Sequence, residues 1–163
     1  MISRHLLLLV AATIAVALPA VAFAKEGEVK IVRVFTGWRA ASSFKHISEY
    51  FDGRENTHGE TMLRTHPDQR GGYYFLLRVA NSGAPVAVKL TVQLIMPAGH
   101  QATSFTFATE LKSGDHVLNL GLTGDDWPDA KANPVAWKLE VTTPDGHVLA
   151  TEKSYLWEKP ATN

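Results

Sequence analysis

Apolar and polar residues alternate along most of the chain after residue 72, with the period of two that is typical of β-strands. The longest run spans residues 86–96. Its six apolar residues of one parity end at Met96, whereas Ala87, Lys89, Thr91 and Gln93 occupy the other parity. Successive side chains of a strand point to opposite faces of a sheet, so this strand is expected to have one core face and one wetter face.

The same alternation predicts further strands, separated by short turn sequences. We expect strands within 29–35, 61–65, 73–80, 104–107, 117–122, 136–142 and 148–157, and turns at 81–85, 112–115 and 144–146. The strands 73–80 and 86–96 are expected to form either a hairpin or a corner between two sheets. The apolar parity of the last strand changes midway, which predicts a β-bulge near Glu152.

The segment between the first strand and residue 72 has a different pattern. Phe44, Ile47 and Phe51 fall at helical spacing and Gly53 follows them, which predicts a short helix over about 43–52, with an extended edge segment as the alternative. Residues 53–72 are polar and rich in Gly, Pro and charge. An insertion of this length in a compact domain is uncommon and is often functional.

Short strands with regular turn signals are the signature of a β-sandwich or barrel. We predict an all-β fold, an approximately seven-stranded antiparallel sandwich with one short helix or irregular insertion near its start. The last two strands and the Pro144-Asp145-Gly146 turn resemble the final hairpin of immunoglobulin-like and fibronectin type III-like domains. The resemblance covers about 73–157 and implies the general sandwich architecture, without the Cys pair of antibody domains.

The first 24 residues are typical of a secretory signal peptide. Arg4 precedes an apolar block, Pro19 interrupts it, and Ala22-Phe23-Ala24 has the small-x-small pattern of a cleavage site. An uncleaved membrane anchor is the alternative, because the apolar block approaches the roughly 20 residues that span a bilayer. We expect cleavage, a sandwich domain over 25–163, and a periplasmic or secreted protein.

Composition narrows the classes of partner. Cleavage of 24 residues from the 163-residue chain would leave 139 residues, with 15 Lys and Arg against 16 Asp and Glu. This near-neutral balance provides no basic surface for nucleic acid and no attraction to an anionic membrane. The chain has no Cys, so an exported domain would depend on core packing rather than on disulfides.

No catalytic or metal motif is present in the sequence. The histidines after residue 24 do not form an H-E-x-x-H or H-x-H pattern, although His58 and His66 share a polar segment with Glu55, Glu60 and Asp68. There is no G-x-S-x-G elbow and no phosphate-binding glycine loop before a helix. We therefore predict no catalytic residues, no metal and no cofactor.

Six residues are candidates for ligand binding. Trp38 and Trp127 lie in expected loops, where a Trp either stacks on a sugar or a partner, or folds back as a lid on the core. Asp125 and Asp126 precede Trp127 and either cap a turn or supply carboxylates for a glycan or Ca²⁺. Arg64 and Arg70 belong to the charged insertion, which is either a polar docking surface or a solvated loop with weak ion pairs.

These observations predict an exported, non-catalytic binding domain whose partner is another exported protein, contacted through loops and an exposed edge strand. A carbohydrate-binding module that uses the loop Trp residues is the alternative. A small periplasmic enzyme is the third hypothesis. The exposure of Trp38 and Trp127 distinguishes the first two.

Overall fold

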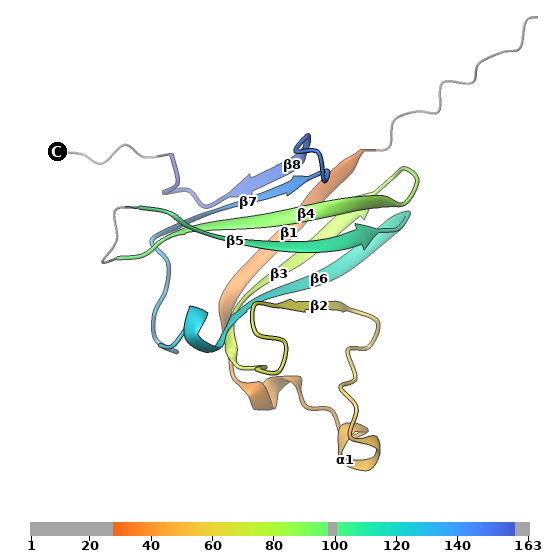
Figure 1. The fold of residues 1–163 in the computed structure, drawn as a ribbon, viewed down its shortest axis with the longest axis vertical. Coiled ribbons are helices and arrows are strands. Elements are labelled where there is room, and N and C mark those ends of the chain that lie inside the picture. The colour runs from red at the N-terminus through yellow and green to blue at the C-terminus, as the bar shows by residue number, and fades with distance from the viewer. Residues whose placement is uncertain (1–27, 98–100, 159–163) are drawn as a thin grey trace, which may run out of the picture.

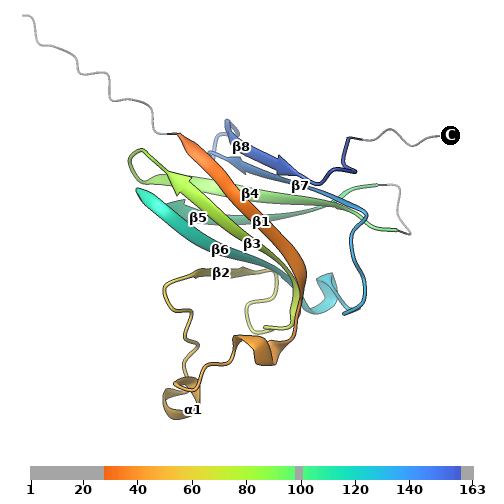
Figure 2. The ribbon, with the colours of Figure 1, turned by 180° about the vertical axis from the view of Figure 1, so that it is seen from behind.

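The computed structural model describes residues 28–97 and 101–158, and its strands form two facing four-stranded sheets (Figures 1 and 2). The predicted signal peptide lies outside the described residues. The strands are β1 (Val29–Arg39), β2 (Thr61–Arg64), β3 (Gly72–Asn81), β4 (Val86–Ile95), β5 (Thr103–Leu111), β6 (Gly114–Thr123), β7 (Ala136–Thr142) and β8 (Val148–Lys153). The all-β sandwich is confirmed, with eight strands where about seven were expected.

One sheet has the order β1-β3-β6-β2 and the other β5-β4-β7-β8. If β2 and β5 are set aside, the first, second and fourth of the remaining strands (β1, β3 and β6) share one sheet and the other three share the second. This is the strand arrangement of immunoglobulin-like sandwiches. One pair departs from the expected antiparallel order, because β2 lies parallel to β6. The strand β2 belongs to the insertion between β1 and β3 and is not joined to β6 by a hairpin, so no tight turn requires the pair to be antiparallel.

The core forms where the predicted apolar parities of the two sheets face each other. On β4 the buried side chains are Val88, Leu90, Val92 and Leu94, as the alternation predicts. They pack with side chains of the opposite sheet, chiefly Phe75, Leu77, Val79, Leu118, Leu120 and Leu122. Apolar burial of this kind is the main stabilising contribution in a chain without disulfides.

The turn at 81–85 is a corner between the sheets, because β3 and β4 belong to different sheets. Asn81 is buried there, and its Nδ2 donates to the carbonyl oxygens of Ala84, Leu111 and Lys112 at 2.9–3.1 Å. Its Oδ1 accepts the backbone N–H of Gly83 at 2.9 Å. One amide side chain therefore ties the β3–β4 corner to the β5–β6 corner.

The predicted helix over 43–52 was wrong in its extent. The segment contains a 3₁₀ turn at Ala41–Phe44 and a single helical turn, α1, at Glu49–Asp52. Gly53 ends α1 in a left-handed conformation, as expected. The apolar spacing at 44, 47 and 51 suits a helix, but only Phe44 packs against the sheet, and short helices without a buried face are marginal.

The predicted bulge near Glu152 was also wrong. Glu152 pairs regularly with Leu139, and the register shifts at the other end of β8, opposite Val141 and Thr142. Strand β8 ends at Lys153, and the residues that follow form turns. The change of parity before Tyr155 and Trp157 therefore reflects the end of the strand. Within the described ranges, no helix has the length and apolar character needed to cross a bilayer.

Candidate functional site

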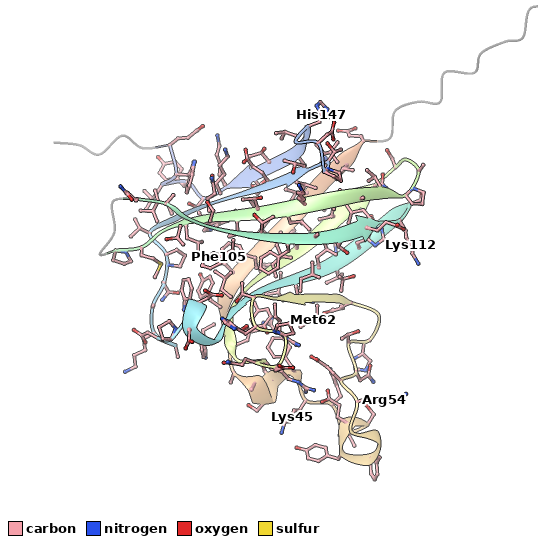
Figure 3. The ribbon with its side chains drawn as sticks, in the orientation of Figure 1. Lys45, Arg54, Met62, Phe105, Lys112 and His147 are labelled. Carbon is pink, nitrogen blue, oxygen red and sulfur yellow. The ribbon has the colours of Figure 1, made fainter. Side chains whose placement is uncertain are left out.

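The insertion of residues 40–71 packs on the outer face of the β1-β3-β6-β2 sheet at Phe44, and α1 lies at the end of the molecule farthest from β8 (Figure 1). Figure 3 labels Lys45, Arg54 and Met62 along this insertion. Its anchor is the contact of Phe44 with Tyr74 of β3, whose ring centroids are 4.6 Å apart. Tyr74 is fully buried, although its parity would point it to solvent in a bare sandwich. Gly121 of β6 makes room for it, because a Cβ there would lie 2.5 Å from Tyr74 Cε1.

Arg64, one of the predicted ligand residues, lies at the centre of this covered face. Its guanidinium donates to both carboxylate oxygens of Glu55, at 2.9 and 2.5 Å, and its Nε donates to Tyr74 Oη at 2.8 Å. The Arg64 side chain is only 5% exposed. The hydrogen bonds from Arg64 lower the pKa of Glu55, and those to Glu55 and Tyr74 raise the pKa of Arg64, so this pair stays ionised at neutral pH.

Arg70 extends the same network toward α1. Its Nη1 donates to Glu49 Oε2 at 2.5 Å, and this hydrogen bond is the main cause of the lowered pKa of Glu49. The other oxygen of Glu49 accepts the backbone N–H groups of His46 and Asn56 at 3.3 Å. Tyr74 Oη donates to the Arg70 carbonyl at 2.7 Å, while burial raises the pKa of Tyr74. Glu49 therefore fixes both ends of the segment that carries α1.

Three large apolar side chains project from this fixed segment. Ile47, Tyr50 and Phe51 are 79%, 77% and 86% exposed, respectively. We call these three residues the apolar tip. Exposed apolar side chains are normal when isolated, whereas contiguous groups of them are a common feature of interaction surfaces. The Glu49 contacts fix the backbone of the segment that carries the tip.

A polar cavity of about 260 Å³ lies between the insertion and the sheet. His46 and His58 border it with their rings edge to face, 4.1 Å between centroids. The buried Asn119 of β6 donates to Glu60 Oε2 at 2.7 Å on its other side. Amide, carboxylate and imidazole groups thus converge on one hollow, an arrangement that can bind hydroxyl or amide groups of a ligand.

The histidines considered as metal ligands do not meet. His58 contacts His46, whereas His66 Nε2 lies 3.2 Å from Asp126 Oδ2 on the other side of the insertion. In the part of the chain that the structure describes, no group of three or more His, Asp or Glu side chains could hold a metal ion.

Trp127 folds back on the core as a lid, one of the two arrangements predicted for it. It is 4% exposed, and its ring stacks on Tyr73 with centroids 4.5 Å apart and planes inclined by 26°. Asp126 pairs with His66, and Asp125 lies exposed beside it. These residues belong to the turn that follows β6, which contacts the insertion at His66.

Trp38 lies within β1 and not in a loop, opposite Tyr73 of β3. Its side chain is 37% exposed and borders a shallow hollow with Phe35 and Arg39. No carboxylate lines that hollow among the described residues. The structure therefore brings Arg64 and Arg70 together, brings Asp126 next to Trp127, and leaves Trp38 apart from both groups.

The apolar tip was missed by reasoning from the sequence. Its residues have the spacing of a buried helical face, and that spacing alone cannot distinguish burial from projection. The available signal was the surroundings, because the polar, Gly-rich residues 53–72 offer no second apolar stretch that could cover the tip.

Comparisons with known proteins identify no family and no activity for this chain. No protein-family model matches the chain, and no curated protein matches it either. A solved structure described as an immunoglobulin-like protein from Pseudomonas aeruginosa is similar over 79% of this chain and 96% of that one, with 18% identity and a TM-score of 0.34. The architecture itself rests on the two sheets described above.

Proposed function

We propose that this chain is an exported, non-catalytic binding domain that contacts a protein partner through the insertion of residues 40–71. The observation that carries the proposal is the apolar tip, Ile47, Tyr50 and Phe51, each more than three quarters exposed. An aromatic anchor that fills a partner's pocket contributes much of the binding energy of an interface. A convex, preorganised tip suits a concave apolar pocket on the partner.

The surroundings of the tip support a specific contact. The pairs Arg70–Glu49 and Arg64–Glu55 already satisfy the charges behind it, so docking would not leave a buried charge without a partner. The sandwich supplies a rigid base through Tyr74, which joins the insertion to β3. Rigid elements that present a few exposed anchors lose little conformational entropy on binding.

Photo-crosslinking in the native cells tests the tip. A photoreactive residue at Tyr50 should capture one protein specifically, whereas the same residue at Tyr155, 81% exposed and following β8 at the opposite end, should not. The captured protein is then purified and its affinity is measured. Equal capture from both positions would contradict the proposal.

The matched variant replaces Ile47, Tyr50 and Phe51 with Ser. We expect its affinity for the captured protein to fall by about 30-fold or more, the effect of losing one or two anchors of about 2 kcal/mol each. Because the three side chains are exposed, the free energy of unfolding should stay within about 0.5 kcal/mol of the parent. An unchanged affinity would show that the partner binds elsewhere.

Export is part of the proposal and is supported by the pattern of residues 1–24. N-terminal sequencing of the protein isolated from its own cells should give Lys25 as the first residue, and fractionation should place it outside the cytoplasm. A mature protein that begins at Met1 would reject cleavage.

A second candidate is glycan binding in the polar cavity, where Asn119, Glu60 and the two imidazoles converge. This site differs from the one predicted from the sequence, in which loop Trp residues stack on the sugar, because Trp127 is buried. Calorimetric titration with a panel of oligosaccharides tests it. Glu60→Gln should weaken any binding, and the absence of heat across the panel would reject this candidate.

A further inference from the structure

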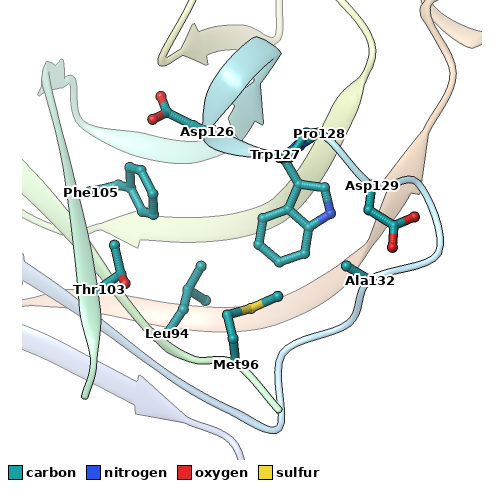
Figure 4. Close-up of a pocket in the computed structure, with 9 residues that line it drawn as sticks. All are labelled: Leu94, Met96, Thr103, Phe105, Asp126, Trp127, Pro128, Asp129 and Ala132. Atoms are coloured by element: carbon teal, nitrogen blue, oxygen red, sulfur yellow. The ribbon is translucent and has the colours of Figure 1, made fainter. Parts of the chain in front are cut away.

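A second cavity lies at the end of the sandwich beside the loop that follows β6, and none of its residues belongs to the apolar tip, although Asp126 pairs with His66 of the insertion. It has a volume of about 210 Å³ (Figure 4). Its walls come from the ends of β4 and β5 and from the loop after β6, which carries Trp127 and Ala132. The cavity exceeds the one of about 150 Å³ that takes up benzene in an engineered protein.

The walls are apolar and the charged groups that border the cavity are acidic. Leu94, Met96, Phe105 and Trp127 form most of the lining (Figure 4). Asp126 and Asp129 border it, and no Lys or Arg does so within the described ranges. His66 pairs with Asp126, whereas Asp129 Oδ1 accepts only the backbone N–H of Lys131 at 2.8 Å among the hydrogen bonds found.

Trp127 brings a polar group to this end of the sandwich. Its Nε1 is buried and has no hydrogen-bond partner among the described residues. Figure 4 shows this nitrogen on the side of the ring that faces Asp129 and Ala132. A buried donor without an acceptor is unfavourable, and such groups in folded proteins call for an explanation.

The hollow opens to solvent and its walls are largely apolar, so a ligand could reach it without a rearrangement of the core. An occupant with an apolar body would complete the packing that Leu94, Met96 and Trp127 begin. The carboxylates select its charge, since an anionic group near Asp126 and Asp129 would be repelled and a cationic group attracted.

We propose that this end cavity binds a small organic cation, with an apolar body the size of one aromatic ring against Trp127 and a primary ammonium group beside Asp129, because Asp126 already pairs with His66. The site is independent of the apolar tip, so either can fail without the other.

The test is a titration of the purified protein with three probes of equal size: benzylammonium, benzyl alcohol and benzoate. The indole N–H resonance of Trp127, assigned by its absence from Trp127→Phe, reports binding at this end. We expect benzylammonium to bind about three- to tenfold more tightly than benzyl alcohol, as one or two exposed charge pairs would give. Benzoate should bind most weakly, and added salt should reduce the preference for the cation.

Paired variants locate the site. Ala132→Leu should fill the cavity and abolish the response, whereas Ala130→Leu, in the same loop but not lining the cavity, should leave it unchanged. Asp129→Asn should remove most of the preference for the cation, and Asp125→Asn, which does not line the cavity, should retain it. Denaturation curves verify that each variant is folded.

Three results would overturn the proposal. They are no response to benzylammonium, equal binding of the cation and the alcohol, and binding that survives Ala132→Leu in the folded protein. The crosslinking experiment on the apolar tip does not depend on any of them.

Discussion

In the sandwich, the side chains that hold the two sheets together are almost all apolar, whereas in the insertion of residues 40–71 ion pairs and hydrogen bonds of charged side chains join the aromatic and backbone contacts. Phe75 and Leu90 contact core neighbours on both sheets and are fully buried. Arg64 and Arg70 instead hold the insertion through Glu55, Glu49 and Tyr74.

The two kinds of contact differ in strength and in purpose. Apolar burial contributes to stability in proportion to area and gives a cooperative core. A partly exposed ion pair contributes little net stability, but its geometry fixes the position of the groups it joins. We therefore expect the insertion to open more readily than the sandwich, and its ion pairs to serve chiefly to position the apolar tip.

The largest expected effect is in the core. Phe75→Ala removes a fully buried ring between the sheets and should lower the free energy of unfolding by about 3–5 kcal/mol. Chemical denaturation followed by tryptophan fluorescence measures it. A loss below about 1 kcal/mol would show that the sandwich does not depend on this packing, and would contradict the statement that apolar burial stabilises it.

A smaller, local effect is expected from Arg64→Met. It leaves Glu55, 26% exposed, with only the longer contact to Arg70 at 3.8 Å and should cost about 1–3 kcal/mol. Hydrogen exchange should show protection lost over residues 43–70 while β3, β4 and β7 keep theirs. Arg64→Lys is the control: it retains the charge but not the forked hydrogen bonds, so it should restore only part of the protection. Equal loss of protection in both regions would show that they unfold as one unit.

The smallest effect is a dependence on pH. The pKa of Glu55 is lowered in the folded protein by its hydrogen bonds with Arg64, so its contribution is present above the unfolded pKa of about 4.3 and is lost as the pH falls toward the folded value. Amide resonances of the insertion should therefore shift as the pH falls below about 4, at a higher pH than those of the sandwich. The associated change in the free energy of unfolding should be below about 1 kcal/mol.

Two variants separate the regions in this experiment. Glu55→Gln should make the insertion less protected at neutral pH and flatten its response to acid. Asp145, in the β7–β8 turn, also has a lowered pKa, mainly through its hydrogen bond with Thr143. Asp145→Asn should change the acid response at that turn and leave the insertion unaffected. An acid response of the insertion that Glu55→Gln does not alter would exclude the Arg64–Glu55 pair as its origin.

Prediction from sequence was successful where one residue's environment depends on its neighbours in the chain. The alternation in 86–96 correctly assigned the buried face of β4, and the Pro144-Asp145-Gly146 turn correctly joined the last two strands. It was unsuccessful in the insertion, where the helical spacing of Phe44, Ile47 and Phe51 describes one residue that packs and two that project.

The candidate site shows the same division. The dense charge of residues 53–72 indicated Arg64 and Arg70 as candidates. It could not identify their partners, because either Arg could pair with several nearby carboxylates. Trp127 illustrates the limit for aromatic residues. Its loop sequence suits a lid or a binding platform equally, and only its stacking on Tyr73 distinguishes them.

The sequence by itself determined the strands, their core faces and most turns, because the period of two and local turn preferences are properties of adjacent residues. The tertiary structure decided the corner at Asn81, the parallel entry of β2, the ion pairs of the insertion, the exposure of the apolar tip and the cavity beside Trp127. Each of these depends on contacts between segments far apart in the chain, as Asn81 with Leu111 and Tyr73 with Trp127 illustrate.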